Sequence, residues 1–146
     1  MHDHKLLGCI NWVMFYACSW FLVAAGGLLG LFVPRWNPFH VDVFAGEIFK
    51  APLVPAVMAS ALNQYRSMKS EEFGFGVFAL LFRREIYGIP KFNRFFLSIV
   101  FLGASVRALS VVVDGRPDFA YIFFMIMELM TGLVVLAYSR TTLKRS

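Results

Sequence analysis

The segment LLGCINWVMFYACSWFLVAAGGLLGLFV, residues 6–33, contains no charged side chain in 28 positions. About 20 residues of apolar helix suffice to cross the hydrocarbon core of a bilayer. We therefore predict that residues 6–33 form a membrane-spanning helix, which ends at Pro34 because proline cannot continue it. The segment is too long for a signal peptide and lacks a small-residue cleavage site.

The composition of the whole chain supports a membrane location. Of its 146 residues, 59% are hydrophobic and only 16% are charged, and the mean hydropathy is +0.67. Soluble domains are roughly 45–50% apolar and about 25% charged. A soluble domain of about 150 residues buries only about 68–70% of its unfolded surface, too little for this composition. These values exclude a disordered chain and a disulfide scaffold, and favour one integral membrane domain over residues 1–146 instead of a soluble enzyme.

Two further apolar segments, about 92–113 and 118–139, lie on either side of the short polar segment DGRPD at 114–118. Glycine and proline in this segment favour a tight turn, to which Asp114, Gly115 and Pro117 contribute. The two segments are therefore predicted to form an antiparallel helical hairpin.

The middle of the chain allows two interpretations. Either a helix over about 61–84 is the second span and carries its polar half inside the protein, or 43–62 spans and 73–82 lies in the interface. We favour the first, which gives an all-α, integral membrane four-helix bundle. An additional interfacial segment, about 41–57, then lies between the first and second helices.

The distribution of positive charge predicts the orientation. The loop at 83–94 and the tail at 140–145 contain seven Lys or Arg, whereas the turn at 114–118 has one Arg and two Asp. The positive-inside rule then places this loop and both termini on the cytoplasmic or matrix side. A bacterial or mitochondrial inner membrane fits this orientation. Since the net charge of +5 lies at the ends of apolar segments, we expect no nucleic-acid partner.

Two ionised side chains lie inside the predicted hairpin. Arg107 is about seven residues, roughly 10 Å of helix, from the turn, and Glu128 is roughly 16 Å beyond Pro117. An unpaired charge at such depth costs at least about 2.5 kcal/mol. In an antiparallel hairpin the two depths differ by about one helical turn, so we predict an ion pair. Glu71 or Glu72 is a second candidate partner for Arg107.

The predicted polar cluster has three alternative roles. It fixes the register of the helices, binds a lipid headgroup or another anion, or belongs to a proton pathway. Its members are Arg107, Glu128, Ser110, Asn63, Arg66 and Glu72.

Small residues mark two helix faces suited to close packing. Gly26 and Gly30 form a GxxxG motif, and Gly103 with Ala104 gives the third helix a similar face. The GxxxG motif packs either against another helix of the same chain or against a partner subunit, and residue spacing does not distinguish the two alternatives. Asn11 is expected to bond a neighbouring helix. No catalytic motif or metal-ligand set is present, since two His and one Asp near the N-terminus are too few ligands.

Three groups of residues resemble a known family. They are Asn63-x-x-Arg66, the string Arg107-x-x-Ser110-x-x-x-Asp114-Gly-x-Pro117, and Glu128 in the last helix. Over about 61–138 the chain is similar to a family of small four-helix membrane proteins catalogued as domain of unknown function number 4345. The resemblance implies that the second helix includes Asn63 and Arg66, and it implies no reaction.

These observations predict a non-catalytic multi-pass membrane protein. We expect an accessory or structural subunit of a larger membrane complex, whose partners are the lipid bilayer and other membrane subunits. The alternative is a lipid- or isoprenoid-binding protein or enzyme with a polar intramembrane pocket around Arg107 and Glu128. We expect no cofactor, although a bound phospholipid is compatible with either hypothesis.

Overall fold

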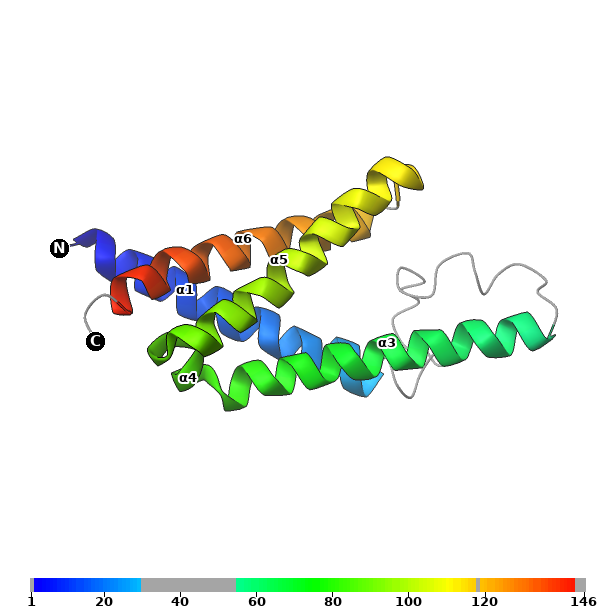
Figure 1. The fold of residues 1–146 in the computed structure, drawn as a ribbon, viewed down its shortest axis with the longest axis horizontal. Coiled ribbons are helices and arrows are strands. Elements are labelled where there is room, and N and C mark those ends of the chain that lie inside the picture. The colour runs from blue at the N-terminus through cyan, green and yellow to red at the C-terminus, as the bar shows by residue number, and fades with distance from the viewer. Residues whose placement is uncertain (1, 30–54, 118, 144–146) are drawn as a thin grey trace. The chain divides into compact units, whose positions relative to one another are not determined.

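The computed structural model describes residues 2–29, 55–117 and 119–143. All regular elements within these ranges are helices, which confirms the all-α prediction for this part of the chain (Figure 1). They are α1 (His2–Phe21), the π-helix η1 (Leu22–Leu29), α3 (Pro55–Leu81), α4 (Arg83–Gly88), α5 (Pro90–Val113) and α6 (Phe119–Thr142). Contacts divide the chain into unit 1, Met1–Cys18 with Ala79–Ser146, and unit 2, Ser19–Phe78.

Three helices are long and apolar enough to cross a membrane. These candidate spans are Lys5–Gly27, Pro90–Val113 and Tyr121–Thr142. They agree in position with three of the four predicted spans and support a membrane protein. The helix α3 does not qualify, because it has four charged side chains within residues 66–72.

The boundaries in the middle of the chain differ from those predicted. The helix α3 begins at Pro55, six residues before the predicted start at 61, and runs without interruption to Leu81. Asn63 and Arg66 therefore lie in a helix. The last three positions of the predicted interfacial segment 41–57 belong to α3, and its other positions lie outside the described residues, as do positions 30–33 of the first predicted helix.

The α5–α6 hairpin in unit 1 has clear local causes. Pro90 occupies the first turn of α5. A backbone N–H at that position has no acceptor within the helix, so proline causes no loss of a hydrogen bond there. At the other end, the backbone N–H of Asp114 donates to the Ser110 carbonyl oxygen at 2.8 Å. Gly115 follows with φ +96°, a left-handed conformation that favours glycine, and reverses the chain. Figure 1 shows α5 and α6 running alongside each other.

Aromatic side chains form the core of unit 1 where α1, α4, α5 and α6 meet. The Tyr87 ring of α4 lies 4.8 Å from Trp12, 5.4 Å from Phe15 and 5.6 Å from Tyr138, measured between ring centroids. Phe15 also contacts Phe96 of α5, with 5.8 Å between the ring centroids. The Tyr87 ring of the short helix α4 thus contacts α1 and α6, and Phe15 of α1 extends the cluster to α5, so this packing positions the hairpin.

Unit 2 contains a close approach between η1 and α3. A Cβ atom at Gly76 of α3 would lie 2.9 Å from Leu22 Cβ and 3.0 Å from the Ser19 carbonyl oxygen, and one at Gly27 would overlap the Phe73 ring. Glycine is therefore needed on both helices, because any side chain would push them apart.

Candidate functional site

Arg107 of α5 and Glu128 of α6 form an ion pair inside the hairpin. Arg107 Nε donates to Glu128 Oε2 at 3.1 Å and Oε1 at 3.2 Å. One N–H is therefore shared between two oxygens, and among the described residues the two η nitrogens donate to no acceptor. The side chains remain 35% and 32% exposed. Both ions thus keep unused hydrogen-bonding capacity on the surface of the hairpin.

The pair lies well inside both apolar helices. Arg107 precedes the end of α5 by six residues, or about 9 Å, and Glu128 follows the start of α6 by nine residues, or about 14 Å. Ionised groups at such depth are costly in hydrocarbon, and pairing reduces that cost. The geometry is suited to holding two helices in register and to receiving a further polar group.

The other predicted members of the cluster have different partners. Ser110 Oγ donates to Asp114 Oδ2 at 2.7 Å and so belongs to the end of α5. Glu72 Oε2 accepts a 2.7 Å hydrogen bond from Lys69 Nζ, an i,i+3 pair within α3. Lys69 was absent from the predicted cluster, although its spacing from Glu72 already indicated such a pair. Asn63, Arg66 and Glu72 all belong to unit 2, whereas Arg107 and Glu128 belong to unit 1.

The predicted small-residue faces have distinct surroundings. A Cβ atom at Gly26 would lie 3.0 Å from Glu72 Cβ, so this glycine packs against α3 of its own chain, while Gly30 lies outside the described residues. Ala104 is buried, and a Cβ atom at Gly103 would make an ordinary 3.6 Å contact with Glu128 Oε2. The tightest glycine of the hairpin is Gly132, which sequence analysis missed because it lacks a small neighbour at helical spacing.

A buried polar network joins the ends of the helices in unit 1. Tyr87 Oη donates to Asn11 Oδ1 at 3.0 Å, which confirms the expected bond from Asn11 to another helix. Asn93 Nδ2 donates to the Ile86 carbonyl oxygen at 3.0 Å, and Ser139 Oγ donates to Asn93 Oδ1 at 3.4 Å. Burial raises the pKa of the Tyr87 phenol far above its ordinary value, outweighing the opposing hydrogen bond to Asn11. The phenol therefore remains neutral and acts as a donor.

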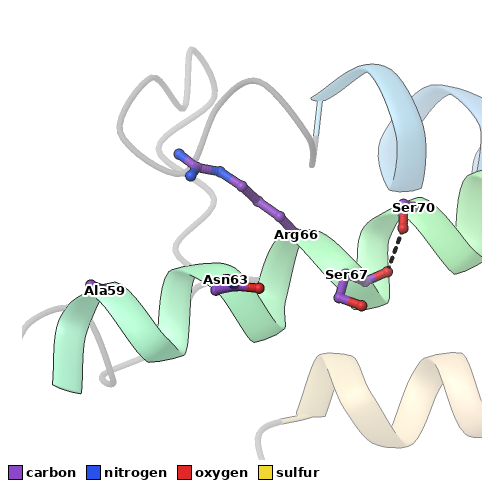
Figure 2. Close-up of a pocket in the computed structure, with 5 residues that line it drawn as sticks. All are labelled: Ala59, Asn63, Arg66, Ser67 and Ser70. Carbon is purple, nitrogen blue, oxygen red and sulfur yellow. Dashed lines mark hydrogen bonds between the residues drawn. The ribbon is translucent and has the colours of Figure 1, made fainter. Parts of the chain in front are cut away.

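Unit 2 has a polar hollow on the exposed side of α3. Figure 2 shows it lined by Ala59, Asn63, Arg66, Ser67 and Ser70, with the Arg66 side chain extended away from the helix. Its volume is about 440 Å³. No group of three or more His, Cys, Asp or Glu side chains that could hold a metal occurs in the described ranges.

A family model matches most of the chain. The match covers residues 15–139, and the family is described as Domain of unknown function (DUF4345). This chain belongs to the DUF4345 family. The match confirms the resemblance and extends it into α1, beyond the region 61–138 on which it was based. Comparison of the DUF4345 chain with curated proteins and with solved structures gives no match.

Proposed function

We propose that this DUF4345 protein is a non-catalytic, multi-pass accessory subunit that packs against other membrane proteins through its α5–α6 hairpin. The observation that carries the proposal is the Arg107–Glu128 pair, of which about a third is exposed although it lies inside two apolar helices. We also propose that the chain has four membrane spans and that both termini face the cytoplasm or matrix.

The unused hydrogen-bonding capacity of the pair favours a protein neighbour. Lipid tails offer neither donors nor acceptors, so the η N–H groups of Arg107 and the remaining lone pairs of Glu128 are unsatisfied against hydrocarbon. A polar side chain on a neighbouring transmembrane helix satisfies them and is worth roughly 0.6–2 kcal/mol per hydrogen bond in a membrane. The pair is then a polar recognition point for another helix.

The exposed surface of α5 away from the pair is largely apolar. Leu102, Val106 and Leu109 of α5 are all more than half exposed. Such side chains contact lipid or a partner equally well, so they contribute little selectivity. A single polar point on an apolar surface discriminates between partners, because a helix without a matching polar group leaves the ions unsatisfied.

The proposed orientation makes α3 the fourth span. Its 27 residues extend about 40 Å, more than the roughly 30 Å of hydrocarbon. The Lys69–Glu72 pair offsets two of its four charges. The basic 83–94 loop and both termini then face the cytoplasm or matrix, which fits a bacterial or mitochondrial inner membrane.

Co-purification from native membranes tests the proposal. After mild solubilisation, the wild-type chain is expected to elute with its partners at fixed stoichiometry. The variant Arg107→Leu/Glu128→Leu, which removes both charges, should lose them. Leu109→Ala is the matched control, because Leu109 is exposed about 200° around α5 from Arg107. Recovery of the wild type as a lone monomer, or equal partner recovery from the double variant, contradicts the proposal.

The same ion pair favours one alternative, a protein that binds a lipid or isoprenoid headgroup around Arg107 and Glu128. The unused η N–H groups of Arg107 can donate to a phosphate as readily as to a protein side chain. Mass spectrometry of co-purified lipids discriminates the two functions. A lipid that is lost in Arg107→Ala while partner proteins remain favours the alternative, whereas identical lipid profiles remove it.

A further inference from the structure

One face of α3 carries hydrogen-bond donors around a single cation. Asn63 lies three and four residues before Arg66 and Ser67, and Ser70 lies four and three residues after them, so the four share one side of the helix, and all are exposed. Together with Ala59 they line the hollow of about 440 Å³ (Figure 2). Among the described residues, the lining contains no carboxylate.

The positive charge of Arg66 is not neutralised within unit 2 as described. The nearby carboxylate of Glu72 is bound by Lys69 at 2.7 Å, and Glu71 lies about 140° around the helix from Arg66. None of the described residues accepts a hydrogen bond from the Arg66 guanidinium. Ser70 Oγ donates to the Ser67 carbonyl oxygen, which leaves the Ser67 hydroxyl and the Asn63 amide as further donors. A cation flanked by neutral hydrogen-bond donors is suited to binding an anion.

The position of Arg66 along α3 indicates where that anion comes from. This step rests on the proposed function, in which α3 crosses the membrane with Leu81 at the cytoplasmic side. Arg66 precedes Leu81 by 15 residues, or about 22 Å of helix. An extended arginine side chain then reaches the headgroup layer of the opposite leaflet, since the hydrocarbon is about 30 Å thick. Lys69 and Glu72 lie deeper and neutralise each other, whereas the guanidinium of Arg66 reaches the headgroup layer.

We propose that the hollow around Arg66 binds the phosphate of an anionic phospholipid in the leaflet opposite the 83–94 loop. The planar guanidinium donates two parallel hydrogen bonds to phosphate oxygens. Asn63, about one turn closer to that headgroup layer than Ser67, donates to a remaining oxygen from the same side of the helix. The site gives α3 a fixed depth in the membrane, because the bound headgroup holds the helix at the interface.

Native mass spectrometry of the full chain in nanodiscs tests the site. The nanodiscs contain phosphatidylcholine and phosphatidylglycerol, and the retained lipids are counted per protein. The wild type should retain phosphatidylglycerol in preference to phosphatidylcholine. Arg66→Gln should lower that preference about tenfold, the effect of losing one charged hydrogen-bonding group. Arg84→Gln, which removes an exposed cation of α4, is the matched control and should retain it.

Two further variants keep the test decisive if Arg66→Gln folds poorly. Arg66→Lys keeps the charge but loses the planar fork, so it should retain only part of the preference. Asn63→Ala keeps both the charge and the planar fork and should reduce the preference by a smaller factor. Unchanged lipid preference in Arg66→Gln overturns the proposal, and so does displacement of phosphatidylglycerol by millimolar inorganic phosphate, which would identify a site for a free anion.

A separate measurement distinguishes failure of the site from failure of the four-span arrangement. Single cysteines at Ala59 and Gly88, in a chain whose own two cysteines are replaced by serine, are labelled with a membrane-impermeant maleimide. Labelling from opposite sides supports a spanning α3, whatever the lipid result. Labelling of both from one side refutes the arrangement and, with it, the lipid site.

Discussion

Removing one partner of the Arg107–Glu128 pair is expected to destabilise the hairpin more than removing both. Glu128→Leu leaves Arg107 without its acceptor among apolar side chains, and Arg107→Leu leaves the carboxylate likewise unpaired. In Arg107→Leu/Glu128→Leu no ion remains to be desolvated, and two apolar side chains take the positions of the pair.

The geometry of the pair sets the size of the effect. An unpaired charge at the centre of a spanning helix costs roughly 2.5–3.5 kcal/mol on insertion scales. The pair lies about 9 Å from the end of α5, and its side chains are 35% and 32% exposed, so part of this cost is relieved. We expect each single variant to lose about 1–2 kcal/mol of unfolding free energy and the double variant less than about 0.5 kcal/mol.

A double-mutant cycle in mixed micelles measures this difference. The four proteins are unfolded by increasing the mole fraction of sodium dodecyl sulfate, and loss of helix is followed by circular dichroism. The expected coupling free energy between the two positions is the sum of the two single losses minus the double loss, or about 1.5–4 kcal/mol. If the two single losses simply add in the double variant, within about 0.5 kcal/mol, then the pair has no energetic role in the hairpin and the reasoning is refuted.

Three further outcomes concern packing and pH. Gly132→Val should lower the melting temperature in detergent by several degrees, because a Cβ atom at position 132 lies 2.9 Å from Phe101 Cε1. Gly74→Ala is the control: a Cβ atom there has nothing within 4 Å, so the melting temperature should stay unchanged or rise. Since burial raises the pKa of Tyr87, the unfolded chain should lose this proton near pH 10 while the folded chain keeps it, so stability should fall as pH rises above about 10. Tyr87→Phe should remove most of this loss of stability at alkaline pH. At neutral pH the same variant should lose about 1 kcal/mol of unfolding free energy, because the hydrogen bond to Asn11 is gone. If the alkaline stability profile of Tyr87→Phe equals that of the wild type, Tyr87 is not the group responsible.

The hairpin and the depth of its charges follow from the sequence alone. Apolar length defines the spans, Gly115 and Pro117 indicate the turn, and helical rise places Arg107 and Glu128 at compatible depths. These arguments work because the membrane imposes one length scale on every span. The structure has Arg107 and Glu128 in hydrogen-bonding contact.

The remaining contacts depend on tertiary packing that spacing does not encode. Tyr87 lies in a short basic segment, so nothing in its neighbours indicated a buried ring that contacts two other helices. Ser110 was assigned to the polar cluster because it follows Arg107 in the string Arg107-x-x-Ser110, but its hydroxyl bonds locally to Asp114, four residues away. The start of α3 was predicted six residues late, because prolines interrupt the preceding segment and Pro55 is in fact accommodated at its first position.

Cysteine accessibility in intact membranes tests most directly whether the hairpin crosses a bilayer. Single cysteines replace Gly88, Val106 and Arg116 in the chain without its native cysteines, and a membrane-impermeant maleimide is added from the cytoplasmic side. Val106 is 56% exposed on the protein itself, so only surrounding lipid or a partner helix can shield it. We expect labelling at position 88, none at position 116 until the membrane is opened, and none at position 106 until the protein is denatured. Rapid labelling at 106, or equal labelling at 88 and 116 in sealed membranes, would contradict a hairpin that spans the membrane.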